Sequence, residues 1–122
     1  QPDGTVLSFA SAYGDKFSLT DDIHAAAAGA DVVFTDVWAS MGMEGEAQQR
    51  RAAFTGYQVN DELLSVCARD VMVQHCLPAH RGEEITESVF EAHANEIFDE
   101  AENRLHAQKA VMVKLMEKPP LF

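Results

Sequence analysis

Two short apolar runs, separated by segments with helical signals, constrain the fold of this chain most. DVVFTD predicts a buried strand over residues 32–35, and VMVQH predicts another over residues 71–75. Strands that alternate with helices pair in parallel, because a helical crossover returns the chain to the same end of the sheet. The sequence therefore predicts an α/β fold: a Rossmann-like, doubly wound parallel sheet flanked by helices, only part of which lies in this chain.

Residue types that cap helices mark where several helices begin and end. Thr20 or Asp21 can cap an alanine-rich helix that stops at Gly29, and Asn60 or Asp61 can cap the helix before the second strand. Each crossover is therefore predicted to be helical.

The remaining blocks continue the alternation. EGEAQQRRAAFTGY is predicted to be a helix that stops at Gly56, and TESVFEAHA a helix capped at Thr86. EIFDE, residues 96–100, is predicted to be a third short strand, and residues 101–116 a long closing helix.

Length and charge exclude several classes of protein. The chain has 122 residues, enough for one domain, with 1–16 an uncertain amino-terminal segment and 119–122 a tail. Nine basic against twenty acidic residues give a net charge of -11, which argues against a nucleic-acid partner. No apolar run is long enough for a membrane span, and no secretory signal is recognisable. Two cysteines fit a reducing compartment, so we expect a cytoplasmic protein.

Polar side chains follow each predicted strand. In an open parallel sheet, ligands bind beyond the carboxyl ends of the strands, so these side chains are expected to converge on one crevice. They are Asp36, Ser40, His75, Cys76 and Arg104.

The stretch HCLPAHRGEE, residues 75–84, has several chemical interpretations. His75, Cys76 and His80 offer three soft ligands, but their spacing matches none of the usual zinc patterns, so no metal is expected. Cys76 could be a nucleophile or a packed strand-end residue. Arg81 and Arg104 could each bind an anion or form a surface ion pair. No G-x-G-x-x-G motif is present, and no cofactor is expected.

Three motifs, DVWASMG, HCLPAHRGEE and FDEAENRLHAQKAVMVKLM, together resemble the carboxyl-terminal, amino-acid-binding domain of the ornithine carbamoyltransferases. The resemblance covers about residues 17–118. It implies that Asp36, Ser40 and Met41 bind ornithine, with the aspartate on its α-amino group and the serine-methionine loop closing over it.

The same resemblance implies roles for the second motif and the closing helix. Cys76, Leu77 and Arg104 match positions that contact carbamoyl phosphate, with Cys76 and Arg104 as the catalytic pair, and the Leu77–Pro78 bond is expected to be cis. Further residues are expected to support the site from close by. These are His75, Pro78, His80 and Arg81.

The implied reaction is carbamoyl transfer from carbamoyl phosphate to the δ-amine of L-ornithine, giving L-citrulline and phosphate. A sister enzyme acting on putrescine, an acylated ornithine or aspartate is one alternative, and a non-catalytic module is another. The family's Ser-Thr-Arg-Thr phosphate motif does not occur in these residues, so we expect the isolated chain to be inactive. The complete enzyme is expected to be a homotrimer through the missing domain, leaving part of the AVMVKLM face exposed.

Overall fold

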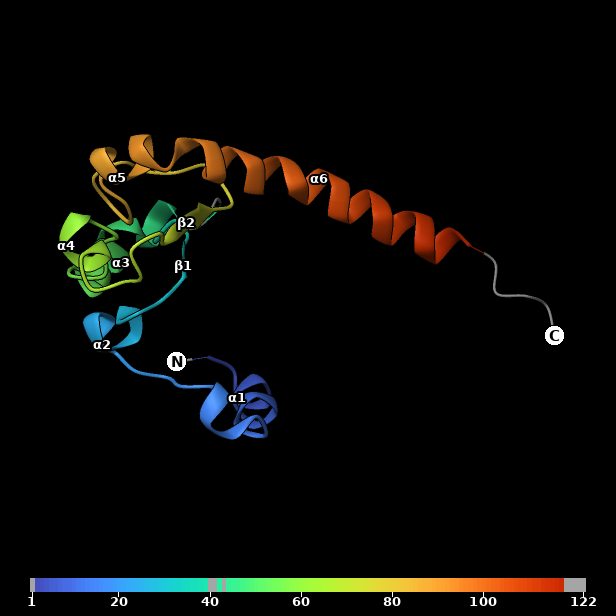
Figure 1. Cartoon of the computed structure of the whole chain (residues 1–122), viewed down its shortest axis with the longest axis horizontal. Coiled ribbons are helices and arrows are strands. Elements are labelled where there is room, and N and C mark those ends of the chain that lie inside the picture. Colours follow the sequence, from blue (N-terminus) through green and yellow to red (C-terminus); the bar gives the residue numbers. More distant parts are fainter. Residues whose placement is uncertain (1, 40–41, 43, 118–122) are drawn as a thin grey trace.

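The computed structural model describes residues 2–39, 42 and 44–117 (Figure 1). Along the chain, the elements are a helix α1 (Gly4–Ser11), a short 3-10 turn η1 (Gly14–Lys16), α2 (Ile23–Ala27), β1 (Val32–Thr35), a second turn η2 (Glu44–Glu46), α3 (Ala47–Phe54), α4 (Asp61–Leu64), β2 (Met72–His75), α5 (Glu87–Ala92) and α6 (Ala94–Met116). This order confirms the predicted α/β class.

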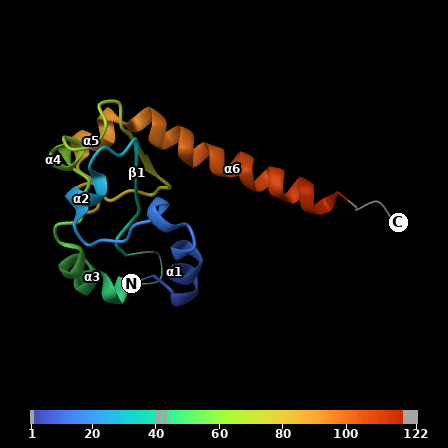
Figure 2. The same ribbon diagram turned by 60° about the horizontal axis from the view of Figure 1, so that its bottom comes forward.

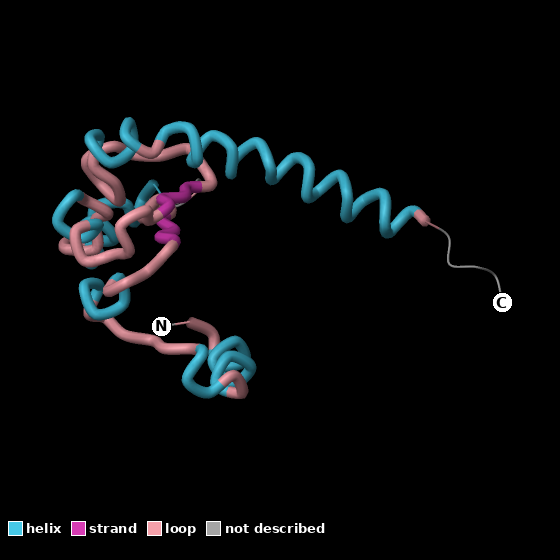
Figure 3. Tube along the Cα trace, viewed as in Figure 1, coloured by secondary structure: helices cyan, strands magenta, loops and turns pink. Residues whose placement is uncertain are grey.

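Within the described residues, β1 and β2 form one parallel two-stranded sheet between helices (Figure 3). Val33 pairs with Val73, and Thr35 pairs with His75. This register ends both strands at the same level, so the residues that follow them emerge side by side at one edge of the sheet.

Most of the predicted caps are confirmed. The Asn60 side chain accepts from the Leu63 amide at 2.9 Å and caps α4, and Thr86 caps α5. The cap of α2 is Asp22, one residue later than predicted: its carboxylate accepts from the amides of residues 24 and 25. Thr20 instead accepts from the Asp22 amide, which fixes the turn before the helix.

The core lies between the sheet and the helices α2, α4, α5 and α6. Val73 of β2 is fully buried and packs with residues from the helices and from the loop after β2. The buried apolar side chains are Ala27, Val59, Leu63, Val73, Ile85, Val89, Phe90 and Ile97. Ile85, at the end of the loop that follows β2, is completely buried in this cluster. The cluster therefore holds that end of the loop in place.

The third strand predicted over 96–100 is wrong, because these residues lie in the first turns of α6. Ile97 points into the core, and Phe98 meets the Phe90 ring edge-on. A helix allows both contacts, whereas an isolated edge strand would not require them. The Glu96 carboxylate accepts the Val73 amide at 2.8 Å. A helix side chain therefore bonds the outer edge of β2, where a third strand was expected.

The second half of α6 leaves the body of the molecule in both views (Figures 1 and 2). Its apolar side chains are 55% to 80% exposed, which confirms the expectation for the AVMVKLM face. They are Val111, Met112, Val113, Leu115 and Met116. Among the described residues, none of the helices combines the length and the apolar character that crossing a membrane requires.

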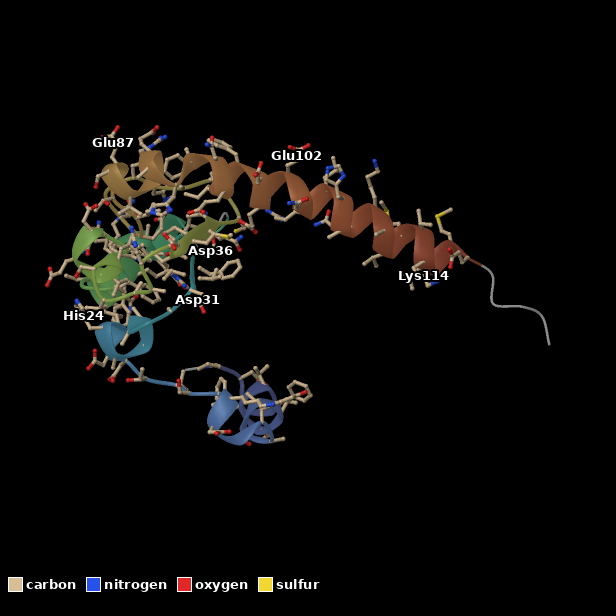
Figure 4. The ribbon with its side chains drawn as sticks, viewed as in Figure 1. His24, Asp31, Asp36, Glu87, Glu102 and Lys114 are labelled. Carbon is tan, nitrogen blue, oxygen red and sulfur yellow. The ribbon has the colours of Figure 1, made fainter. Side chains whose placement is uncertain are left out.

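We predict that Glu96→Ala lowers the free energy of unfolding by about 1–2 kcal/mol, because the amide of Val73 loses its acceptor at the edge of the sheet and His93 loses its bond to the same carboxylate. Urea unfolding followed by circular dichroism measures this change. The matched control is Glu102→Ala on the same helix, since Glu102 is exposed and points away from the body (Figure 4). Equal losses for the two variants would contradict the assignment.

Candidate functional site

A cavity of about 230 Å³ opens at the edge of the sheet where β1 and β2 end. Asp36 follows β1 directly and lies below the first half of α6 (Figure 4), Cys76 follows β2, and Arg104 reaches in from α6. Leu77, Pro78 and His80 complete the lining on the side of the β2 loop, together with Val37 and Ala39. The structure thus brings Asp36 and Cys76 together, as the strand order predicted, while Arg104 joins them from α6 rather than from the end of the expected third strand.

Two hydrogen bonds join these three residues. The Cys76 thiol donates to Asp36 Oδ1 at 3.4 Å, and an Arg104 N–H donates to the backbone carbonyl of Cys76 at 2.8 Å. Asp36 Oδ1 also accepts from the Val37 amide at 2.8 Å, which holds the carboxylate at the end of β1. The site therefore presents a carboxylate, a thiol and a guanidinium from three separate elements.

The environment of Cys76 favours the neutral thiol. Burial raises its pKa above the ordinary value, and the hydrogen bond to Asp36 and the negative charge of Asp36 raise it further. Glu100 adds to the rise, while the positive charge of Arg104 opposes it. A reactive cysteine needs a lowered pKa, so this setting argues against Cys76 as a nucleophile.

The turn that carries Cys76 has an unusual backbone. The Leu77–Pro78 bond is cis, as the sequence predicted, and Leu77 has a φ of 55°, in the left-handed region that non-glycine residues seldom adopt. His75 Nδ1 accepts the Leu77 amide at 2.9 Å. A side chain two residues earlier therefore holds the amide of this turn in place.

His75 is in turn fixed by a residue that the sequence did not single out. Since Nδ1 accepts a hydrogen bond, the proton lies on Nε2, which donates to Glu84 Oε1 at 3.0 Å. Glu84 Oε1 also accepts the His80 amide at 2.6 Å, and both His75 and Glu84 are completely buried. No spacing or periodicity in the sequence indicates a role for Glu84, because only the fold of the loop brings it to its partner His75.

The other predicted site residues have different outcomes. His75 lies behind the cavity and does not line it, whereas Pro78 and His80 do. Arg81 pairs with Glu91 at 2.7 Å and stacks over the Phe90 ring, so it forms the surface ion pair rather than part of the cavity. Ser40 and Met41 fall outside the described residues.

Two groups of side chains bring metal-ligating atoms within 4.8 Å of one another: Asp36, His75 and Cys76 form one, and His80, Glu83 and Glu84 the other. In the first, both His75 ring nitrogens are already engaged and the thiol is held neutral. That group is therefore poorly suited to hold an ion.

In the cavity, the Asp36 carboxylate can accept a hydrogen bond from an ammonium or amine, and the Arg104 guanidinium can donate one to an oxyanion. The Cys76 thiol, which has little tendency to ionise, lines the same cavity. Residues 2–115 match the family Aspartate/ornithine carbamoyltransferase, Asp/Orn binding domain. The chain belongs to this family.

Relatives and solved structures agree with the family assignment. The ornithine carbamoyltransferase of Methanosarcina mazei is 54% identical over 116 residues, which cover 95% of this chain and 38% of the relative. The crystal structure of the anabolic ornithine carbamoyltransferase from Campylobacter jejuni matches with a TM-score of 0.87 at 39% identity, over 94% of this chain and 39% of that one.

A family member with a different name also matches. A crystal structure of an N-acetyl-L-ornithine transcarbamylase gives a TM-score of 0.73 at 30% identity, over 95% of this chain and 37% of that one. The chain spans about 38% of the length of the curated archaeal relatives that it matches.

We predict opposite effects of two substitutions on the alkylation of Cys76 by iodoacetamide. Asp36→Asn removes a negative charge that raises the thiol pKa, so the thiolate fraction and the rate at pH 8 increase, whereas Arg104→Gln removes a positive charge and slows the reaction. Mass spectrometry of Cys76 as a function of pH measures both, with Cys67 in the same chain as the internal reference. Shifts of the same sign in both variants would refute this description of the site.

Proposed function

We propose that this chain forms the ornithine-binding half of an ornithine carbamoyltransferase. The complete enzyme transfers the carbamoyl group of carbamoyl phosphate to the δ-amine of L-ornithine, giving L-citrulline and phosphate. The observation that carries the proposal is the convergence of Asp36, Cys76 and Arg104 on one cavity in a member of this family.

Asp36 is the residue proposed to bind the α-amino group of ornithine. This group is an ammonium at neutral pH in the bound zwitterion, and a carboxylate held by a backbone amide is a suitable partner for it. Ser40 and Met41, which follow β1 in the sequence, are proposed to contact the same substrate.

The attacking δ-amine must be uncharged, yet an alkylamine with a pKa of about 10 is mostly protonated at neutral pH. A thiolate beside it would favour the ammonium form and so oppose attack. Burial and Asp36 keep Cys76 as a neutral thiol, which removes that opposing charge. We therefore assign Cys76 to contact with the substrate rather than to a covalent intermediate.

Arg104 is proposed to stabilise the negative charge that develops on the carbamoyl oxygen and the departing phosphate. One of its N–H groups fixes the Cys76 carbonyl, and the guanidinium carries further donors that this bond does not use. Leu77 extends the contact surface for the carbamoyl group. Loss of one such donor typically lowers the rate by on the order of a hundredfold.

The part of the protein outside this chain is proposed to hold most of the carbamoyl phosphate and to form a trimer. The chain matches only 38% of its relatives' length and carries a net charge of -11, which gives it few groups to bind a dianion. We expect the chain alone to produce no citrulline, because the two substrates must be positioned together for attack.

The alternative is a sister enzyme with another amine substrate. The match to an N-acetyl-L-ornithine transcarbamylase keeps acylated ornithine open, and putrescine remains a second candidate. An acylated α-amine is uncharged and gains little from Asp36, and putrescine has no carboxylate. Asp36 therefore favours ornithine over an acylated ornithine. Putrescine also carries a second ammonium that suits Asp36, so a direct comparison of the two amines decides between ornithine and putrescine.

A chimera tests the proposal: this chain replaces the matching 116-residue segment of the Methanosarcina mazei protein. We predict citrulline formation, with kcat/KM for ornithine above that for putrescine and N-acetylornithine. Asp36→Asn should raise the KM for ornithine about tenfold or more, since a charge-assisted hydrogen bond is lost. Arg104→Gln should lower kcat about a hundredfold.

Glu102→Gln is the matched control, because Glu102 is exposed two residues before Arg104 and does not line the cavity. A folded chimera that prefers putrescine or N-acetylornithine would overturn the substrate assignment. A folded chimera that carbamoylates none of the three amines would overturn the proposed function itself.

A further inference from the structure

We propose that His80, Glu83 and Glu84 form a binding site for a divalent transition-metal ion of the Zn²⁺ type in the loop after β2. Each residue offers one ligand atom, and the three atoms lie within 4.8 Å of one another. His80 also lines the cavity of Asp36, Cys76 and Arg104, but none of those three residues is a ligand of this site, and the inference does not depend on the proposed function.

Unpartnered carboxylate oxygens are the main evidence. Glu83 Oε2 and Glu84 Oε2 are both buried and have no hydrogen-bond partner among the described residues. The other oxygen of each carboxylate is bonded, Glu83 Oε1 to Arg51 at 2.8 Å and Glu84 Oε1 to His75 and the His80 amide. Buried carboxylate oxygens without a donor are costly, and a cation bound by these carboxylates would supply a partner that the described residues do not.

The third ligand is an imidazole that is not otherwise engaged. His80 Nδ1 lies 3.9 Å from Glu83 Oε2, which is too long for a hydrogen bond. The His80 side chain is 47% exposed, so the ring can turn toward the carboxylates, and an ion and its water ligands can enter from solvent. One nitrogen and two carboxylate oxygens favour Zn²⁺ or a similar ion over Mg²⁺ and Ca²⁺, which prefer oxygen alone.

The backbone of the loop already holds the ligands close together. The Glu83 amide donates to the His80 carbonyl at 2.9 Å, and the Gly82 amide donates to the Ile85 carbonyl at 2.8 Å. Gly82 has a φ of 89°, which allows this tight turn. Zinc ligands lie about 2.0–2.2 Å from the ion. The exposed His80 ring therefore needs to move inward, while buried Glu84 stays in place.

The charge balance favours a cation. Two carboxylates face one guanidinium, that of Arg51, which is paired to the oxygen of Glu83 that the ion does not need. The spacing in the sequence suggests His80 as a metal ligand only together with His75 and Cys76, whereas both carboxylates of the present site follow His80 in the chain. An ion here would also brace Glu84, the acceptor for His75.

The test is Zn²⁺ titration of the chelator-treated chain by isothermal calorimetry. We predict one site, with affinity at least tenfold weaker in His80→Ala and in Glu83→Gln. Cys76→Ser and His106→Ala are matched controls that should bind as the parent chain does, because Cys76 belongs to the other group and His106 is an exposed histidine on α6. Circular dichroism verifies that each variant is folded.

Cobalt substitution gives a second readout that a structural defect does not imitate. Bound Co²⁺ should show visible absorption without the charge-transfer bands that a thiolate ligand produces. Absence of binding in the parent chain would overturn the proposal. So would binding that survives in His80→Ala and Glu83→Gln, and so would loss of binding in Cys76→Ser, which would place the ion at Asp36, His75 and Cys76 instead.

Discussion

The hydrogen bond between His75 and Glu84 is the interaction on which the site depends most. Both side chains are completely buried, and together they connect the end of β2, the Leu77 amide and the His80 amide. A buried polar pair contributes little net stability by itself, but removing one partner leaves the other without a hydrogen bond, at a cost of about 1–3 kcal/mol and more when the remaining group is charged. The pair therefore restricts the loop after β2 to one arrangement, and Cys76 and Leu77 are placed by that arrangement.

The parallel register of the sheet supplies the other half of the site. Because Thr35 and His75 are paired, Asp36 and Cys76 follow at the same edge, near enough for the thiol to donate to the carboxylate. Arg104 then closes the cavity by bonding a backbone carbonyl rather than a side chain. Such a bond does not depend on the residue type at position 76, so the guanidinium is positioned by the fold of the turn itself.

Much of this could be predicted from the sequence, since local signals decide it. Asn60 and Thr86 cap helices through their own side chains, and the strand over 32–35 is a β-branched run with clear limits. The predicted convergence of Asp36, Cys76 and Arg104 is confirmed, although Arg104 reaches the cavity from a helix and not from the end of a strand. Residues 96–100 were misassigned because two adjacent apolar residues fit either element, and only packing on Phe90 and the bond from Val73 decide between them. Glu84 and the partner of Arg81 follow from tertiary contacts that leave no pattern in the sequence.

The protonation of the His75 ring tests this account most directly, because only one tautomer permits both of its hydrogen bonds. A long-range ¹H–¹⁵N correlation spectrum of the ¹⁵N-labelled chain reports which ring nitrogen carries the proton. The account predicts a neutral ring with the proton on Nε2 and an unprotonated Nδ1 that accepts from Leu77. A proton on Nδ1, whether alone or together with one on Nε2, would contradict it.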